Sequence, residues 1–260
     1  MMDYPTFQKK RKKLAKLRSL ILPGLDYVEN ENNLDFLPEK LRKKYGVFNT
    51  ENVSAHPYDE FAEEVLASKP SGIFLDCGCG KRPKYLENVV NYEIVNYEST
   101  DVLGVAEELP FIDNSFDGVL SLNVLEHVQN PFKCAQEISR VLKPGGKLYC
   151  VVPFMSPYHD YPDHYYNMTK SGLKNLFDRH LVIDKQEVIK SGLPIYSLTW
   201  ILHSWAQGLP ANTLDDFLNM KVKDLLGEPV SYLDKPFVYE LPKDKNFELG
   251  ATTALWAHKT

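Results

Sequence analysis

A short apolar strand that ends in a glycine turn constrains the fold of this chain most. Residues 73–75 are apolar and follow a break at 70–72, as a strand covered on both faces requires. Gly78 and Gly80 carry no Cβ, so the backbone after the strand can bend tightly and approach a ligand closely. Nucleotide-like cofactors bind beyond the carboxyl end of the first strand of an open α/β sheet, so residues 73–80 predict such a site.

Strands and helices are expected to alternate from residue 71 to residue 152. This alternation predicts right-handed crossovers and an α/β fold, with a mostly parallel sheet and helices on both of its faces. A helix is expected directly after the glycine turn, with its unpaired N–H groups at the cofactor. A further strand is expected at 181–188, and helices at 60–67, 169–177, 196–207 and 212–226.

Four short motifs follow the glycine turn in order. They are Leu-Pro-Phe (109–111), Ser-Phe-Asp (115–117), Leu-Glu-His (125–127) and Leu-Lys-Pro-Gly-Gly (142–146). Together they resemble the class I S-adenosylmethionine-dependent methyltransferases, in particular the small-molecule branch, over roughly residues 70–180. The resemblance implies a Rossmann-like sheet, S-adenosylmethionine as the cofactor, methyl transfer as the activity, and an antiparallel strand near the C-terminus. Residues 251–258 are the candidate for that strand.

By the same resemblance, the methionine half of the cofactor contacts the glycine turn at Asp76, Cys77, Gly78 and Gly80. Asp76 is expected to attract the α-ammonium group, and Arg82 stands where the family often has a third glycine. Glu98 follows the turn by about twenty residues, a spacing at which an acid accepts hydrogen bonds from both ribose hydroxyls. Asp101 is the alternative ribose ligand.

The adenine is expected beside Ala106 and Glu107. Many members of the family have an acid at the position of Val105, and valine cannot replace it as a hydrogen-bond acceptor. The residues just past the next strand are expected to flank the reactive end of the cofactor, and they are Ser121, Leu122 and Asn123.

Residues 153–168 are expected to form a substrate-covering insert over the same edge of the sheet. His159 and His164 in this insert are the candidate general bases, because imidazole titrates near neutral pH. Alternatively, the insert is a lid in which backbone carbonyls satisfy both histidines. His127 is a third catalytic candidate, unless it fixes the start of a helix. No metal site is expected, since Cys77 and Cys79 lack a matching Cys or His pair at zinc spacing.

This insert resembles methyltransferases encoded beside glycosyltransferases in bacterial polysaccharide clusters. The resemblance implies a sugar or glycan hydroxyl as the acceptor and methylation at oxygen, although the composition also fits a quinone, a lipid or an aromatic metabolite. Two rival functions stay open. One is an NAD-dependent dehydrogenase, whose fingerprint needs a glycine where Pro83 stands. The other is a non-catalytic cofactor-binding or scaffolding protein, which the departures at Arg82 and Val105 favour.

Composition and charge narrow the class of protein and its partners. The formal net charge of −5 argues against sequence-independent nucleic-acid binding, and no apolar stretch approaches the length of a membrane span. Four cysteines without a Cys-x-x-Cys motif, and an N-terminus without a secretory signal, predict a cytoplasmic protein.

The expected organisation is an N-terminal helical and loop extension (1–60) followed by a methyltransferase domain (61–260) that includes the helical segment 196–226. The basic segment Lys9–Arg18 is expected to be a solvated helix face, with weak contact to an anionic membrane surface as the alternative.

Overall fold

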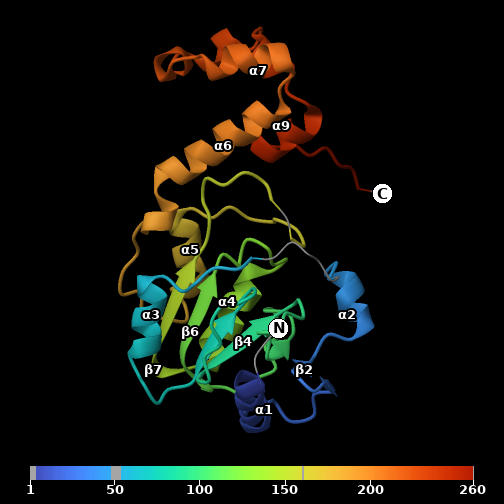
Figure 1. Cartoon of the computed structure of the whole chain (residues 1–260), viewed down its shortest axis with the longest axis vertical. Coiled ribbons are helices and arrows are strands. Elements are labelled where there is room, and N and C mark those ends of the chain that lie inside the picture. Colours follow the sequence, from blue (N-terminus) through green and yellow to red (C-terminus); the bar gives the residue numbers. More distant parts are fainter. Residues whose placement is uncertain (1–3, 48–53, 160, 260) are drawn as a thin grey trace. The chain divides into compact units, whose positions relative to one another are not determined.

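The structure is a computed structural model that describes residues 4–47, 54–159 and 161–259, and it divides into two compact units (Figure 1). We call residues 1–154 and 160–186 the sheet unit, and residues 155–159 and 187–260 the helical unit. This division differs from the expected boundary at residue 60, because the N-terminal segment adds two helices and two strands to the sheet unit.

The sheet unit is built on a seven-stranded sheet in the order β1-β2-β5-β4-β3-β6-β7. The strands are β1 (Val28–Glu29), β2 (Leu34–Asp35), β3 (Phe74–Cys77), β4 (Val89–Glu93), β5 (Val102–Leu103), β6 (Phe116–Leu122) and β7 (Leu142–Val151). Every neighbouring pair is parallel except β1 and β2, which confirms the mostly parallel sheet. The predicted place of the antiparallel strand was wrong, because it lies at the N-terminal edge and residues 181–188 and 251–259 form no strand.

Helices cover both faces of the sheet, as the sequence predicted. In the sheet unit they are α1 (Tyr4–Leu17), α2 (Glu39–Lys44), α3 (Glu60–Ala67), α4 (Pro131–Val141) and α5 (Lys170–Phe177). On one face, Ala62 and Val65 of α3 pack with Phe74 and other strand residues. The alternating strand residues of the other face pack against α4, where Ile138 is fully buried.

The helical unit has its own small core around Leu209, Phe217 and Leu241. Its helices are α6 (Pro194–Gly208), α7 (Ala211–Leu218), α8 (Pro236–Tyr239) and α9 (Lys243–Leu249). The expected helix at 212–226 ends at Leu218 and resumes only as a short 3-10 turn at residues 222–225. Among the residues that the structure describes, no helix is long and apolar enough to cross a membrane.

The connections on both sides of β4 contain no helix, so the predicted helix after the glycine turn was wrong. Residues 78–88 are too few for a helical crossover with a turn at each end, and Pro83 interrupts them. Helix α1 packs there instead. The Lys10 ammonium donates to the carbonyls of Glu98 (2.7 Å) and Thr100 (2.6 Å), which belong to the connection between β4 and β5.

Asp101 joins α1 to the centre of the sheet. Its carboxylate accepts hydrogen bonds from the Tyr85 hydroxyl (2.6 Å) and the Asn91 amide (2.9 Å), and it lies 2.6 Å from the Lys13 ammonium. Burial lowers the pKa of Lys13 and lowers that of Lys10 to about 8. The sequence predicts a solvated face for the basic segment. The structure differs, because two of its lysines are buried in the sheet unit.

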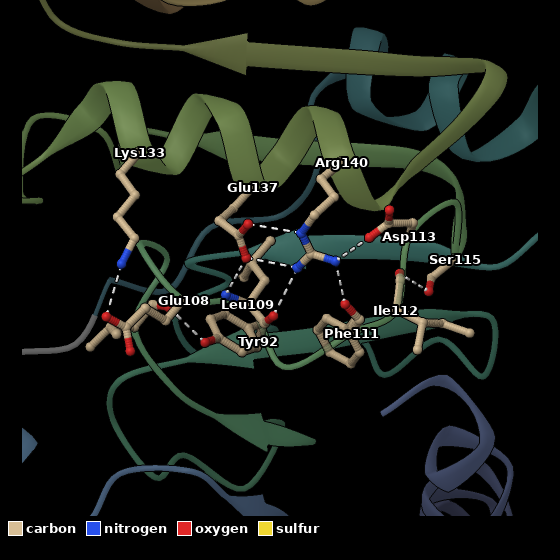
Figure 2. A network of polar contacts seen from close by, with 11 residues as sticks. Tyr92, Glu108, Leu109, Phe111, Ile112, Asp113, Ser115, Lys133, Glu137 and Arg140 are labelled. Carbon is tan, nitrogen blue, oxygen red and sulfur yellow. Dashed lines mark hydrogen bonds and ion pairs between the residues drawn. The ribbon is translucent and has the colours of Figure 1, made fainter. Parts of the chain in front are cut away.

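Two of the sequence motifs have structural roles. Arg140 of α4 donates to the carbonyls of Leu109 (3.0 Å) and Phe111 (2.6 Å) and pairs with Glu137 and Asp113, so it holds the Leu-Pro-Phe motif against α4 (Figure 2).

Asp117 of the Ser-Phe-Asp motif pairs with Lys69 (2.5 Å) and Lys143 (2.8 Å) and accepts a hydrogen bond from the Ile73 amide (3.0 Å). These donors lower the pKa of Asp117 far below its ordinary value, against the effect of burial. The motif therefore ties the start of β6 to the segment that leads into β3 and to the start of β7.

Replacing Lys13 by methionine should destabilise the protein strongly. Lys13→Met leaves the buried Asp101 carboxylate without its cation, and breaking one side of a buried ion pair costs about 3–5 kcal/mol of unfolding free energy. Urea denaturation measures the change. The control is Lys12→Met, an exposed lysine one position away, which should change the unfolding free energy by less than about 0.5 kcal/mol. Equal effects of the two substitutions would contradict the role of the pair.

Candidate active site

Three parallel strands place the candidate residues at one edge of the sheet. Asp76 of β3 pairs in register with Asn91 of β4 and with Leu120 of β6. The residues that follow these strands therefore meet at the carboxyl edge, as the sequence predicted for the first strand. They include the glycine turn after β3, Glu93 at the end of β4, and Asn123 after β6.

The glycine turn needs both of its glycines. Gly78 has φ of 75°, and a Cβ there would lie 2.4 Å from Cγ2 of Val124. Gly80 has φ of 59°, and a Cβ there would lie 2.6 Å from the carbonyl oxygen of Ser54. Any other residue would meet both a left-handed backbone and a clash. The backbone of the turn is therefore held close to the segments at 54 and 124.

Asp76 is fully buried and has a cationic partner within the chain. Its carboxylate contacts Arg82 through Nε (2.6 Å) and Nη2 (3.1 Å), and it accepts a hydrogen bond from the Tyr58 hydroxyl (2.7 Å). Arg82 also donates to the carbonyl of His56 (3.0 Å) and stacks over the Tyr58 ring. The residue that replaces the family's third glycine therefore pairs with the acid expected to attract an ammonium group.

The acid at the end of β4 is Glu93, which the sequence reasoning missed. Its Oε2 accepts a hydrogen bond from the Gly80 amide (2.7 Å), and its Oε1 accepts one from Ile94 (2.8 Å). Burial raises the pKa of Glu93, against the effect of these backbone donors. Glu98 is exposed and lies beyond the end of the strand. The missing helix shortens the stretch of sequence between the turn and the end of β4, so the acid at the end of this strand is Glu93 and not Glu98.

Residues 105–107, beside which the adenine is expected, are buried, and the Glu107 side chain forms hydrogen bonds within the chain. Val105 and Ala106 are 4% and 7% exposed, and the Val105 carbonyl accepts the Tyr92 hydroxyl (2.8 Å). Oε1 of Glu107 accepts hydrogen bonds from the amides of Gln129 (3.1 Å) and Asn130 (3.4 Å), directly before α4. The Glu107 carboxylate therefore fixes the start of this helix.

Ser121 and Leu122 end β6, and Asn123 follows with φ of 55°. The Leu-Glu-His motif comes next and contains a buried acid. Glu126 is fully buried, and neither of its carboxylate oxygens has a hydrogen-bond partner among the residues that the structure describes. Burial raises the pKa of Glu126 to about 8. Sequence reasoning singled out the neighbouring histidine and overlooked this acid.

The structure brings two of the three candidate histidines together. The rings of His127 and His164 have centroids 5.8 Å apart, and His127 Nδ1 lies 2.7 Å from the Asp163 carbonyl oxygen. His159 belongs to the helical unit, where its ring lies 5.2 Å from that of Trp200 and its Nδ1 lies 3.0 Å from the carbonyl oxygen of Pro157. The expected insert is thus divided between the two units.

The comparison with protein families covers this edge of the sheet. Residues 75–150, from the end of β3 to the end of β7, match the family model described as a methyltransferase domain. This part of the chain is therefore a methyltransferase domain.

Relatives of the methyltransferase domain overlap only part of the chain. An uncharacterized protein of Methanocaldococcus jannaschii is 38% identical over 96 residues, which are 33% of this chain and 42% of that protein. A demethylmenaquinone methyltransferase of Renibacterium salmoninarum is 36% identical over 104 residues, which are 40% of this chain and 38% of that protein. The chain therefore spans less than half the length of these curated relatives. A solved S-adenosylmethionine-dependent methyltransferase of Methanosarcina mazei has a TM-score of 0.41 and 20% identity over 53% of this chain and 93% of its own.

The residues at this edge of the methyltransferase domain fit S-adenosylmethionine. The glycine turn brings backbone to the carboxyl end of β3, where any Cβ would clash. Glu93 presents a carboxylate at the end of the neighbouring strand, and an ionised carboxylate has about four acceptor positions, more than its backbone donors use. Both features suit a ligand with ribose hydroxyls and a charged amino-acid end.

Glu126 should make the stability of the protein fall as the pH rises. The pKa of an unfolded glutamate is about 4.3, so between that pH and about 8 the folded protein binds this proton more tightly than the unfolded chain does. The unfolding free energy therefore falls across this window. Glu126→Gln lacks the ionisation and should show a weaker fall when urea denaturation is repeated from about pH 5 to about pH 8. Glu64→Gln, at an exposed position, should follow the unmodified protein. Parallel curves for Glu126→Gln and the unmodified protein would exclude the raised pKa.

Proposed function

We propose that this protein transfers a methyl group from S-adenosylmethionine to the hydroxyl oxygen of a small-molecule or glycan acceptor. The observation that carries the proposal is the contact between Glu93 and Gly80. It joins the acid at the end of β4 to the glycine turn at the end of β3, inside a region that matches the methyltransferase domain model. The contact thereby holds the glycine turn and the Glu93 carboxylate together at the carboxyl edge of the sheet, where both can contact S-adenosylmethionine.

Glu93 is the proposed ribose ligand in place of Glu98. Its position at the end of β4 supports this role, because the neighbouring parallel strand carries the glycine turn. Asp76 and Arg82 are the proposed partners of the methionine end, the carboxylate of Asp76 for its ammonium and the guanidinium of Arg82 for its carboxylate. A guanidinium binds a carboxylate through two parallel N–H groups, which a third glycine cannot do.

The remaining predicted contacts stay part of the proposal. Val105 and Ala106 offer an apolar surface to the adenine, which therefore lacks a carboxylate partner at residue 105. The other proposed contacts are Cys77, Gly78, Gly80, Ser121, Leu122 and Asn123.

Methyl transfer demands alignment above all. When bound, S-adenosylmethionine supplies an electrophilic methyl group on a sulfonium. The chain has to hold the acceptor oxygen in line with that methyl group and exclude water, and such orientation is worth roughly 7–11 kcal/mol of the barrier. A hydroxyl acceptor also has to lose its proton, so a nearby base is needed. His127 and His164, which lie together, support an oxygen acceptor.

The acceptor class rests on the aromatic insert. Tyr165 and Tyr166 are 40% and 41% exposed, and aromatic rings of this kind can cover the face of a sugar. A quinone is the competing acceptor, since a named relative is a demethylmenaquinone methyltransferase. We propose a cytoplasmic protein without nucleic-acid partners. Weak contact with an anionic membrane surface stays a prediction, because α1 carries exposed cations.

A specific observation favours a second candidate, a non-catalytic scaffold. Arg82 neutralises Asp76 within the chain, so an incoming ammonium group has to share this carboxylate with a guanidinium. If the Arg82 guanidinium stays on Asp76 and does not bind the carboxylate of S-adenosylmethionine, the protein does not bind this cofactor.

Calorimetric titration with S-adenosylmethionine and S-adenosylhomocysteine tests the proposal, with NAD as the control. We expect micromolar dissociation constants for the first two and no heat from NAD. A labelled methyl group is then followed into nucleotide sugars, glycans and a demethylated menaquinone. Absence of binding by both sulfur ligands would contradict the proposal and leave the scaffold, whereas methylation of the quinone alone would correct the acceptor class.

Glu93→Gln should weaken the binding of S-adenosylmethionine at least tenfold, or about 1.4 kcal/mol, because the ribose hydroxyls lose a carboxylate partner. Glu98→Gln is the matched control and should leave the affinity unchanged, since Glu98 is exposed beyond the strand. The same calorimetric titration measures both variants, and thermal unfolding verifies that each is folded. The reverse order of effects would restore Glu98 as the ribose ligand.

A further inference from the structure

Glu126 and His127 face each other through specific atoms. Glu126 Oε1 lies 3.9 Å from His127 Nε2, while the side chains of Glu126 and His127 are 1% and 18% exposed. This separation is too long for a direct hydrogen bond and within the range of an ion pair. Neither oxygen of Glu126 has a hydrogen-bond partner among the described residues, so none of these residues satisfies the carboxyl group.

A backbone carbonyl sets the tautomer of His127. Its Nδ1 lies 2.7 Å from the Asp163 carbonyl oxygen, which can only accept a hydrogen bond. Nδ1 therefore carries hydrogen, and in the neutral ring the lone pair is on Nε2, the atom that faces Glu126. This is the reverse of the tautomer that free histidine favours in water.

The surrounding backbone holds the pair in place. The Glu126 carbonyl accepts hydrogen bonds from the amides of Tyr165 (2.7 Å) and Tyr166 (3.2 Å), so the insert that carries Asp163 is fastened to the Leu-Glu-His motif. Titratable side chains of the sheet unit near the pair include His164, whose ring lies beside His127, and Cys150. Burial and then the Glu126 charge raise the pKa of Cys150 to about 12, so this thiol stays neutral near neutral pH.

We propose that Glu126 and His127 form an acid–base pair that, in its deprotonated state, receives the proton of the acceptor hydroxyl and then shares it between the two side chains. This inference rests on the proposed methyl transfer and specifies its base. A carboxylate and a neutral imidazole that face each other carry one negative charge, and uptake of one proton makes the pair neutral whichever atom holds it. The pair therefore gains a proton without placing net charge in a buried site.

The transfer balances as a single displacement. The acceptor oxygen forms a bond to the methyl carbon, and the methyl–sulfur bond breaks with its electron pair left on sulfur. The hydroxyl proton passes to the Glu126–His127 pair and later returns to water. No oxidant or other reactant is needed. The proposed proton acceptors are Oε1 of Glu126 and Nε2 of His127, and a hydroxyl group bonded to Oε1 would satisfy the buried carboxylate.

Nuclear magnetic resonance of the whole protein, labelled with ¹⁵N in histidine and ¹³C in glutamate, tests the pair without an acceptor. His127→Asn identifies the ring signals. We expect His127 to show hydrogen on Nδ1 and not on Nε2 when neutral. We also expect the Glu126 carboxyl and the His127 ring to change in the same pH range, and Glu126→Gln to move the His127 midpoint by about one pH unit or more.

Controls separate this inference from the proposed function. His180→Gln replaces an exposed histidine outside the pair and should leave the linked transitions in place. Calorimetry with S-adenosylmethionine should give the same affinity for Glu126→Gln as for the unmodified protein. Hydrogen on Nε2 of neutral His127, or a His127 midpoint that Glu126→Gln leaves unmoved, would overturn the pair. Loss of cofactor binding by the unmodified protein would overturn the proposed function instead.

Discussion

The buried ion pair between Lys13 and Asp101 supports the part of the sheet on which the site depends. Asp101 also bonds to the Asn91 amide inside β4, so this carboxylate fixes the strand that carries Glu93. A buried acid without its cation would be costly, and α1 supplies that cation from far along the sequence. The N-terminal helix is therefore part of the structural support of the methyltransferase domain, although it lies outside the matched residues 75–150.

The absence of a helix on either side of β4 explains several other features of the sheet unit. The glycine turn is followed by residues 81–88 without a helix, so Ser54 and His56 lie against the turn and against Arg82. The same shortening brings Glu93 close to Gly80 in sequence and in space. The absent helix thus decides both which acid lies at the end of β4 and which segments support the turn.

Charge at the site is arranged in two self-contained groups. Asp76 with Arg82 forms one group, in which a cation of the chain neutralises a buried acid. Glu126 with His127 forms the other, in which the acid has no hydrogen-bond partner among the described residues and its pKa is raised to about 8. The first group suits a ligand that carries both an ammonium and a carboxylate, and the second suits a ligand that brings a proton.

The sequence by itself determined the parallel sheet, the glycine turn and the methyltransferase family, because these depend on local apolar runs and on residues that tolerate a positive φ. The tertiary structure decided the rest. The acid that ends β4 is Glu93 and not Glu98, and the antiparallel strand lies at the N-terminal edge, because the lengths of connections and the pairing of strands are not encoded by any one segment. The burial of Lys13 and Glu126 was equally hidden, since a charged residue is buried only where distant segments close around it.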